Sequence, residues 1–168
     1  GGEHTIREYR PGAEEDQSRG PRARHANMLA IGRDYLPALE VPLLQGRLFD
    51  RRDSVPDAEK VAIINETLAH KLRPDGSALG CLVQQGVVEL GYWCPDAYRV
   101  VGVVADLPDI QERQARPQMY VPAGPDELSC YFYLHLRDRE AVETLRSQMV
   151  EEIHRVDPYI PVLSVATL

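Results

Sequence analysis

The residues that could ligate a metal ion lie far apart along this chain. Glu66 with His70, and Glu151 with His154, each place two potential ligands on one face of a predicted helix. A zinc site needs at least a third protein ligand, and neither pair has a candidate nearby in the sequence. We therefore expect these four residues to lie on helix surfaces, and we predict no metal site.

Two pairs of aspartates are close enough in sequence to share a cation, Asp50 with Asp53 and Asp106 with Asp109. A calcium loop would add a glycine at its turn and a bidentate glutamate at its far end, and neither pair has both. A hydrolytic carboxylate pair stays open as an alternative, because the apolar surroundings that raise one pKa cannot be read from sequence. We expect solvated loop carboxylates.

The sequence also lacks the common motifs of nucleophilic and nucleotide chemistry. No serine lies in a Gly-x-Ser-x-Gly elbow, and neither Gly-x-Gly-x-x-Gly nor Gly-Lys-Ser/Thr occurs. We therefore predict no catalytic residue, no cofactor site and no enzymatic activity. An enzyme whose catalytic partners are distant in sequence and meet only in the folded chain is a third, less favoured hypothesis.

Composition limits the classes of partner. The 168 residues carry a formal net charge of −7, with 43% hydrophobic residues. Nucleic acids and anionic membranes select clustered Lys and Arg, so we predict no nucleic-acid partner. No apolar run approaches the roughly 18 residues of a membrane-spanning helix, and a chain of this length buries about 70% of its unfolded surface.

The elements that must position any site begin after an irregular start. Residues 1–24 are expected to be flexible, apart from one edge strand over His4–Tyr9. The pattern becomes regular with a strand at Asn27–Ile31. Asp34 then stands at the N-cap position of a short helix over residues 35–39.

The middle of the chain alternates strands with one short helix. Lys60–Ile64 is an apolar strand, and Asn65 is a good N-cap for a helix over Glu66–Leu72. Three further strands are expected at residues 81–85, 87–90 and 98–104, separated by Gly86 and by the turn residues 91–95. The last is rich in valine, which indicates a strand covered on both faces, and Gly102 within it indicates close backbone approach.

The end of the chain predicts a strand, a helix and a second strand. The strand covers Tyr131–Leu136, and Asp138 would cap the helix. Apolar residues then recur at helical spacing from Ala141 to Ile153, and Ile160–Thr167 returns as a strand. This order is typical of a split βαβ half of a ferredoxin-like layer.

Four short patterns follow one another in a specific order. They are YLPALEVPLLQGRLF at Tyr35–Phe49, VAIINETLA at Val61–Ala69, YRVVGVVAD at Tyr98–Asp106 and MYVP at Met119–Pro122. In this order they resemble the periplasmic core domain of MacB-like, FtsX-related ABC-transporter permeases. The chain departs from that pattern at Leu36-Pro37, where an aromatic residue is expected, and at Arg73–Gly80, which lacks a second proline.

The resemblance implies an α+β fold of two lobes. A porter-type, ferredoxin-like lobe would combine residues 25–50 with 125–168, and a smaller mixed α/β lobe would be inserted at residues 51–124. Residues 1–24 would be a flexible or edge segment. Membrane spans, and a strand and helix after the first span, would lie outside this sequence.

The resemblance also implies a function without catalysis. Such a domain lies on the extracytoplasmic, periplasmic side of a bacterial inner membrane and couples ATP-driven motion to a periplasmic partner or cargo. Its partners would be the membrane-spanning part of the same permease, a cognate ATPase subunit and an adaptor or cargo protein. The isolated domain would be a monomer, and the full transporter a dimer. The alternative is a small-molecule or peptide-binding module without a transport role.

Two groups of residues follow from this interpretation as candidates. Tyr92, Trp93, Tyr98 and Tyr120 are the aromatic residues expected to contact a partner, unless they pack the inserted lobe's core. Cys81 and Cys94 flank a predicted hairpin, and the implied compartment permits a disulfide between them. The alternative is that Cys81, Cys94 and Cys130 are all buried or half-buried thiols.

Overall fold

The computed structural model describes residues 2–9, 24–87, 92–107, 115–124 and 142–156. They fall into two units, Gly1–Tyr133 and Leu134–Leu168, each described by itself. The strands of the first unit are β1 Gly2–Tyr9, β2 Arg24–Ile31, β3 Leu43–Gly46, β4 Val61–Asn65, β5 Leu82–Val87, β6 Tyr92–Val104 and β7 Gln118–Pro122. Its helices are α1 Tyr35–Ala38, the 3-10 helix η1 Arg51–Ser54 and α2 Glu66–Leu72.

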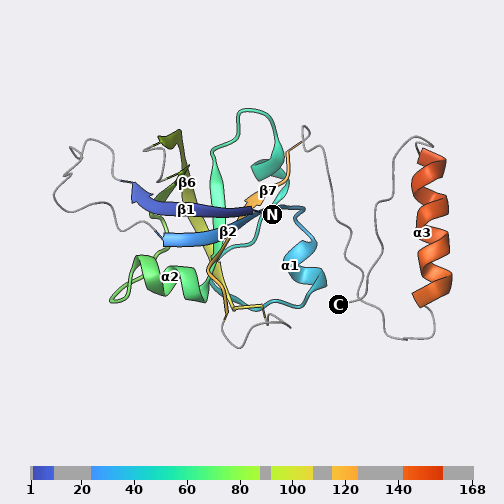
Figure 1. Ribbon diagram of the computed structural model, residues 1–168, viewed down its shortest axis with the longest axis horizontal. Coiled ribbons are helices and arrows are strands. Elements are labelled where there is room, and N and C mark those ends of the chain that lie inside the picture. Colours follow the sequence, from blue (N-terminus) through green and yellow to red (C-terminus); the bar gives the residue numbers. More distant parts are fainter. Residues whose placement is uncertain (1, 10–23, 88–91, 108–114, 125–141, 157–168) are drawn as a thin grey trace. The chain divides into compact units, whose positions relative to one another are not determined.

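The seven strands form one mixed sheet that closes on itself. Their order is β3-β6-β4-β7-β2-β1-β5, and β5 pairs again with β6. The pairs β2–β7 and β4–β6 are parallel, and the other pairs are antiparallel. In Figure 1, β1 and β2 run across the direction of β6, as expected for a strongly twisted sheet. The circuit β6-β4-β7-β2-β1-β5-β6 leaves β3 beside β6, as a terminal strand of the order.

β6 closes this circuit because its two halves pair with different strands. Tyr92–Arg99 pairs with β5, Arg99–Val104 pairs with β4, and Gly102–Val104 also pairs with β3. The predicted turn at residues 91–95 is therefore wrong for residues 92–95, which lie in the strand. Pro95 has no amide hydrogen to donate to a ladder, and it falls where the β5–β6 register shifts. Gly86 likewise lies inside β5 and does not end it.

Alternation along β4 and β7 builds a core on each face of these strands. Ala62 and Ile64 join one buried cluster, whereas Val61 and Ile63 join the other. The first cluster also contains Ile6, Ala26, Leu68, Leu72, Ala78, Val83, Val100, Val103, Met119 and Val121. The second also contains Ile31, Leu36, Val41, Phe49, Val104 and Tyr120. Both strands are therefore central, as their near-continuous apolar sequences indicate.

β1 is the main correction near the start of the chain. The predicted strand is present, but it is not at an edge, because it pairs with β2 on one side and with β5 on the other. Ile6 is fully buried between them. Local alternation identified the strand, but a second pairing partner as distant in the sequence as Gly86, which pairs with Thr5, leaves no signal in a local pattern.

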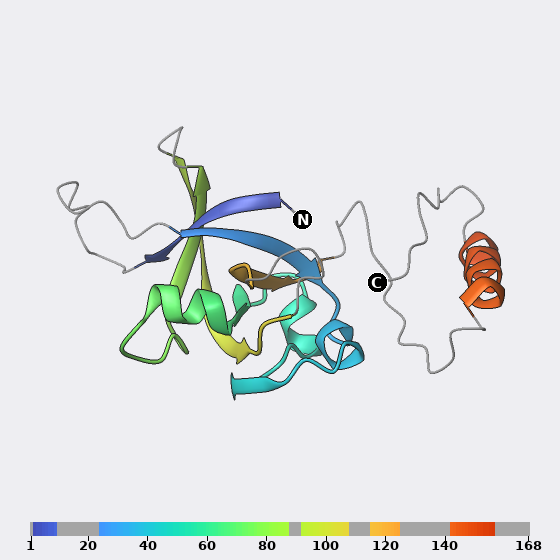
Figure 2. The same ribbon diagram turned by 60° about the horizontal axis from the view of Figure 1, so that its bottom comes forward.

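The predicted segment from Lys60 to Leu72 is confirmed. β4 ends at Asn65, whose side chain accepts a hydrogen bond from the Leu68 amide at the start of α2. α2 ends at Leu72, before Pro74, and Figure 2 shows it lying along the outside of the strands. Asp34 does precede α1, but its side chain makes no capping hydrogen bond.

The second unit is described only at α3, Val142–Val156. This confirms the predicted helix in position, and the half-buried residues Leu145, Met149, Val150 and Ile153 follow its apolar stripe. Asp138 and the strands predicted at 131–136 and 160–167 lie outside the described residues. The ferredoxin-like lobe therefore stays a prediction. The division into one lobe of residues 25–50 plus 125–168 and another of residues 51–124 also stays a prediction. Strands from residues 25–50 and from residues 51–124 nevertheless share one sheet.

Candidate functional site

Two glycines hold β3 tightly against the end of β6. A Cβ atom on Gly102 would lie 2.3 Å from the Arg47 carbonyl oxygen. A Cβ atom on Gly46 would lie 2.1 Å from the Val101 carbonyl oxygen, and Gly46 has a φ of +75°. The Arg47 amide donates to the same Val101 oxygen at 2.9 Å. This is the close backbone approach that Gly102 was expected to mark.

β3 carries exposed leucines that the sequence analysis did not single out. Leu43 and Leu44 are 41% and 46% exposed, and Leu79, which contacts the Gly46 position, is 41% exposed. Gln45 accepts a hydrogen bond from Ser77 at 2.7 Å, which ties β3 to the same loop. Among the described strands β3 pairs only with β6. An edge strand with exposed apolar side chains is suited to contact another polypeptide.

A polar network joins α2 to β4, to β7 and to the segment that follows β6. Asn65 accepts from the amides of Leu68 at 3.1 Å and Gln118 at 2.8 Å, and its amide donates to Asp106 Oδ1 at 2.5 Å. Asp106 also accepts from the Thr67 amide and hydroxyl, at 3.1 and 2.7 Å. Asp106 was considered as a cation ligand with Asp109, which lies outside the described residues. The hydrogen bonds that Asp106 accepts from Thr67 instead fix the start of α2.

Asp50 and Asp53 form a capping box with two arginines. Arg47 donates to both Asp53 oxygens at 2.6 and 2.8 Å, and the Asp50 amide donates to Asp53 at 2.8 Å. Arg52 holds Asp50 through its guanidinium and its amide. The hydrogen bonds from Arg52 lower the pKa of Asp50 to about 2, and that from Arg47 lowers the pKa of Asp53. The two carboxylates therefore have a structural role, in ion pairs with these arginines.

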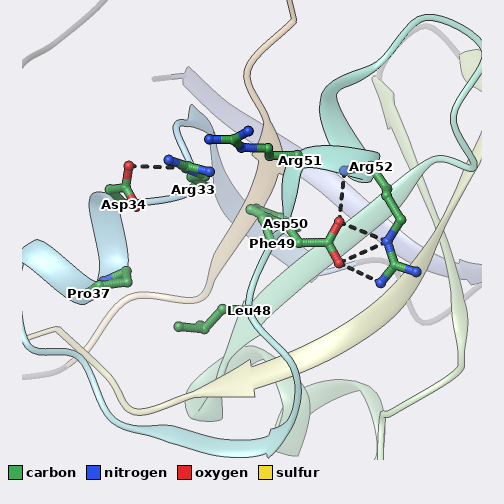
Figure 3. A pocket seen from close by; sticks show the side chains of 8 residues that line it. All are labelled: Arg33, Asp34, Pro37, Leu48, Phe49, Asp50, Arg51 and Arg52. Carbon is green, nitrogen blue, oxygen red and sulfur yellow. Dashed lines mark hydrogen bonds and ion pairs between the residues drawn. The ribbon is translucent and has the colours of Figure 1, made fainter.

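An open groove of about 470 Å³ lies between the start of α1 and η1 (Figure 3). Its lining residues are Arg33, Asp34, Pro37, Leu48, Phe49, Asp50, Arg51 and Arg52. Arg33 pairs with Asp34 at 3.2 Å, and Arg52 pairs with Asp50 at 2.7 Å. Sequence analysis missed this groove because its two sides come from separate segments.

The other metal-ligand candidates lie on surfaces. His70 and Glu66 are exposed on α2, and His154 and Glu151 are exposed on α3. Over the part of the chain that is described, no three His, Cys, Asp or Glu side chains gather as a metal site would require.

The predicted aromatic contacts do not form one surface. Tyr120 is fully buried, and burial raises its pKa well above the usual range, so in this structure its ring packs the core and cannot contact a partner. Its ring lies 6.3 Å from that of Tyr35. Tyr98 is half-buried against the first core cluster. Tyr92 and Trp93 lie in β6 opposite Val87 and Gly86, and their side chains lie outside the described part.

Of the two alternatives for Cys81 and Cys94, the structure has the free thiols and not the disulfide. Cys81 and Cys94 are both free thiols of intermediate burial. The Cys81 carbonyl accepts from the Val100 amide at 2.9 Å, which places Cys81 six residues along β6 from Cys94. At about 3.3 Å per residue, this separation is far beyond the Cα–Cα distance of about 7 Å that a disulfide tolerates. Cys130 lies outside the described residues.

Comparison with known proteins decides the family. The model of the MacB-like periplasmic core domain matches residues 5–152. The chain belongs to this family. It is thus related to the periplasmic domains of ABC-transporter permeases, as the four ordered motifs predicted, and no enzyme family is indicated.

Solved structures of the same kind share the fold of this MacB-like domain. The periplasmic region of MacB from Actinobacillus actinomycetemcomitans aligns with a TM-score of 0.57 at 17% identity, over 92% of this chain and 64% of that one. The extracellular domain of the transporter YknZ from Gram-positive bacteria gives the same score and identity, over 92% and 72%. A permease domain from Porphyromonas gingivalis gives 0.53 at 20% identity, over 92% and 70%.

The chain thus spans less than two thirds of the length of the MacB periplasmic region. No curated protein matches this sequence significantly. Within the described residues, no helix has the length and apolar character that crossing a membrane requires.

Proposed function

We propose that this chain is a non-catalytic, extracytoplasmic domain of an ABC-transporter permease, which couples ATP-driven motion of the membrane domain to a periplasmic partner or cargo. The observation that carries this proposal is the match to the MacB-like periplasmic core domain over residues 5–152. The proposed partners are the membrane-spanning part of the same permease, its cognate ATPase subunit and a periplasmic adaptor or cargo protein. In the full transporter two copies would face each other.

The sheet has the mechanical character that such a role needs. A domain that transmits displacement must not absorb it by bending. The closed circuit of pairings leaves β1, β2, β4, β5 and β7 bonded to a neighbour on both sides. Because β4 and β7 are also packed on both faces, a local shift in one strand is resisted by close-packed neighbours.

The exposed edge of β3 is our proposed partner contact. Leu43, Leu44 and Leu79 give it an apolar surface, and its backbone rests on the close approach at Gly102. Tyr92, Trp93 and the half-buried Tyr98 stay proposals for a second contact. Tyr120 is withdrawn from this set because it is buried.

The first test is the coding sequence on either side of this segment. Membrane spans encoded on both sides, with an ATPase gene nearby, would support the proposal. A coding region bracketed closely by start and stop codons would overturn it in favour of the alternative, a small-molecule or peptide-binding module without a transport role.

The second test measures the motion itself. A spin label at the exposed residue Asp57, in a full permease lacking other cysteines, reports the distance between two copies. We expect the distance distribution to shift when the ATPase is trapped with nucleotide. An unchanged distribution in a complex that still hydrolyses ATP would overturn mechanical coupling.

A further inference from the structure

The groove between α1 and η1 combines positive charge with an apolar floor. Three arginines face two aspartates around it, in a chain whose formal net charge is −7. Phe49, which is buried, and Leu48, which is half-buried, line it together with the charged side chains. A concave surface with a few convergent polar groups over apolar side chains is the usual form of a small-ligand site.

The two carboxylates in the groove are already engaged by their own arginines. Asp50 is contacted by Arg52 through three guanidinium hydrogen bonds of 2.7–3.2 Å and an amide hydrogen bond of 2.8 Å. Asp34 is bonded to Arg33. Neither carboxylate is bonded to Arg51.

Arg51 is the unused cation of the groove. It is exposed, and within the described residues no hydrogen bond or ion pair is recorded for it. Arg33 also lines the groove, and both arginines are labelled in Figure 3. An anion bound in a groove lined by both guanidinium groups would accept charge-assisted hydrogen bonds, which are stronger than those between neutral groups.

We propose that this groove binds a small amphiphilic anion, with its phosphate or carboxylate group between Arg33 and Arg51 and its apolar part against Leu48, Phe49 and Pro37. The ligand is a dissolved molecule and not an anionic membrane surface, because the acidic chain as a whole is repelled from such a surface. This site goes beyond the coupling role, and either proposal can fail without the other.

The test is a titration of the ¹⁵N-labelled 168-residue chain with hexyl phosphate, inorganic phosphate and hexanol, followed by amide chemical shifts. Hexyl phosphate should bind most tightly, with saturable shifts at residues 48–52. Arg51→Gln should weaken its binding about tenfold, which corresponds to about 1.4 kcal/mol. The control is Arg99→Gln, because Arg99 is an exposed arginine like Arg51 but pairs with Glu59 outside the groove.

Several results would overturn the proposal. Equal binding of hexyl phosphate and inorganic phosphate would show that the apolar side chains do not contribute to binding. Equal binding of hexyl phosphate and hexanol would show that the arginines do not contribute. An equal loss of affinity for hexyl phosphate in Arg51→Gln and Arg99→Gln would show that the effect comes from net charge alone. Arg51-dependent binding to phosphatidylglycerol vesicles that exceeds binding to hexyl phosphate would identify a membrane surface as the ligand.

Discussion

At the residue scale, Gly102 is a position at which the packing of β3 against β6 leaves no room for a side chain. An alanine Cβ would lie 2.3 Å from the Arg47 carbonyl oxygen, so β3 and β6 would have to separate. We expect Gly102→Ala to lower the free energy of unfolding by about 1–3 kcal/mol, the usual cost of overpacking. Urea denaturation measures it. Gly76→Ala is the control, because nothing lies within 4 Å of that position, and an equal loss in both variants would contradict the argument.

Asp53 makes a pH-dependent contribution to stability. The folded-state pKa values of Asp50 and Asp53 both lie below the ordinary 3.8. Ionised carboxylates therefore stabilise the fold fully above pH 3.8, and this stabilisation is lost as the pH falls through the lowered values, about 2 for Asp50.

Asp53→Asn should therefore destabilise most at neutral pH. Its side chain is only 6% exposed and accepts two hydrogen bonds from Arg47, so we expect a loss of about 1–3 kcal/mol at pH 7. The difference from the natural sequence should narrow as the pH falls below 3.8. Urea unfolding at pH 7 and pH 3 measures this, and a gap that widens at low pH would contradict the assignment.

At the scale of elements, the junction of β4 and α2 depends on Asn65. Asn65→Ala removes the helix cap and leaves the part-buried Gln118 amide and the Asp106 carboxylate each without one partner. We expect a loss of about 2–3 kcal/mol, from the cap and the unsatisfied groups together. Amide hydrogen exchange should show faster exchange at the start of α2 and in β7. Thr67→Val removes only the hydroxyl contact to Asp106 and should cost less.

The same segment shows how far sequence carries the fold. Asn65, Pro74 and the apolar spacing of α2 are local signals, so the helix and its ends were predicted correctly. The start of β6 was predicted too late, at Tyr98, because Pro95 and the nearby glycine favour a turn, whereas the irregular β5–β6 pairing accommodates Pro95 within the strand. The internal position of β1 and the groove at Arg51 also escaped prediction, since both depend on partners from distant segments.

At the scale of the whole molecule, the ordered motifs identified the family although no single one is specific. The four motifs contribute residues to α1, β3, β4, α2, β6 and β7. They are Tyr35–Phe49, Val61–Ala69, Tyr98–Asp106 and Met119–Pro122. These elements contribute most of the second core cluster and share the first with β1, β2 and β5. The motifs therefore reflect the packing of one sheet, and they do not indicate a transported substrate.

The two core clusters should unfold together. Alternate residues of β4 and β7 belong to opposite clusters, so losing one cluster removes the support of the other. Ile6→Ala and Phe49→Ala truncate side chains that are 0% and 7% exposed, one in each cluster. We expect losses of about 2–5 kcal/mol for each, and Val55→Ala, at a residue 53% exposed, should change little. Far-UV circular dichroism and the fluorescence of Trp93 should give coincident transitions in both variants. Separate transitions, with each substitution shifting a different one, would show two independently folding lobes and would contradict the single closed sheet.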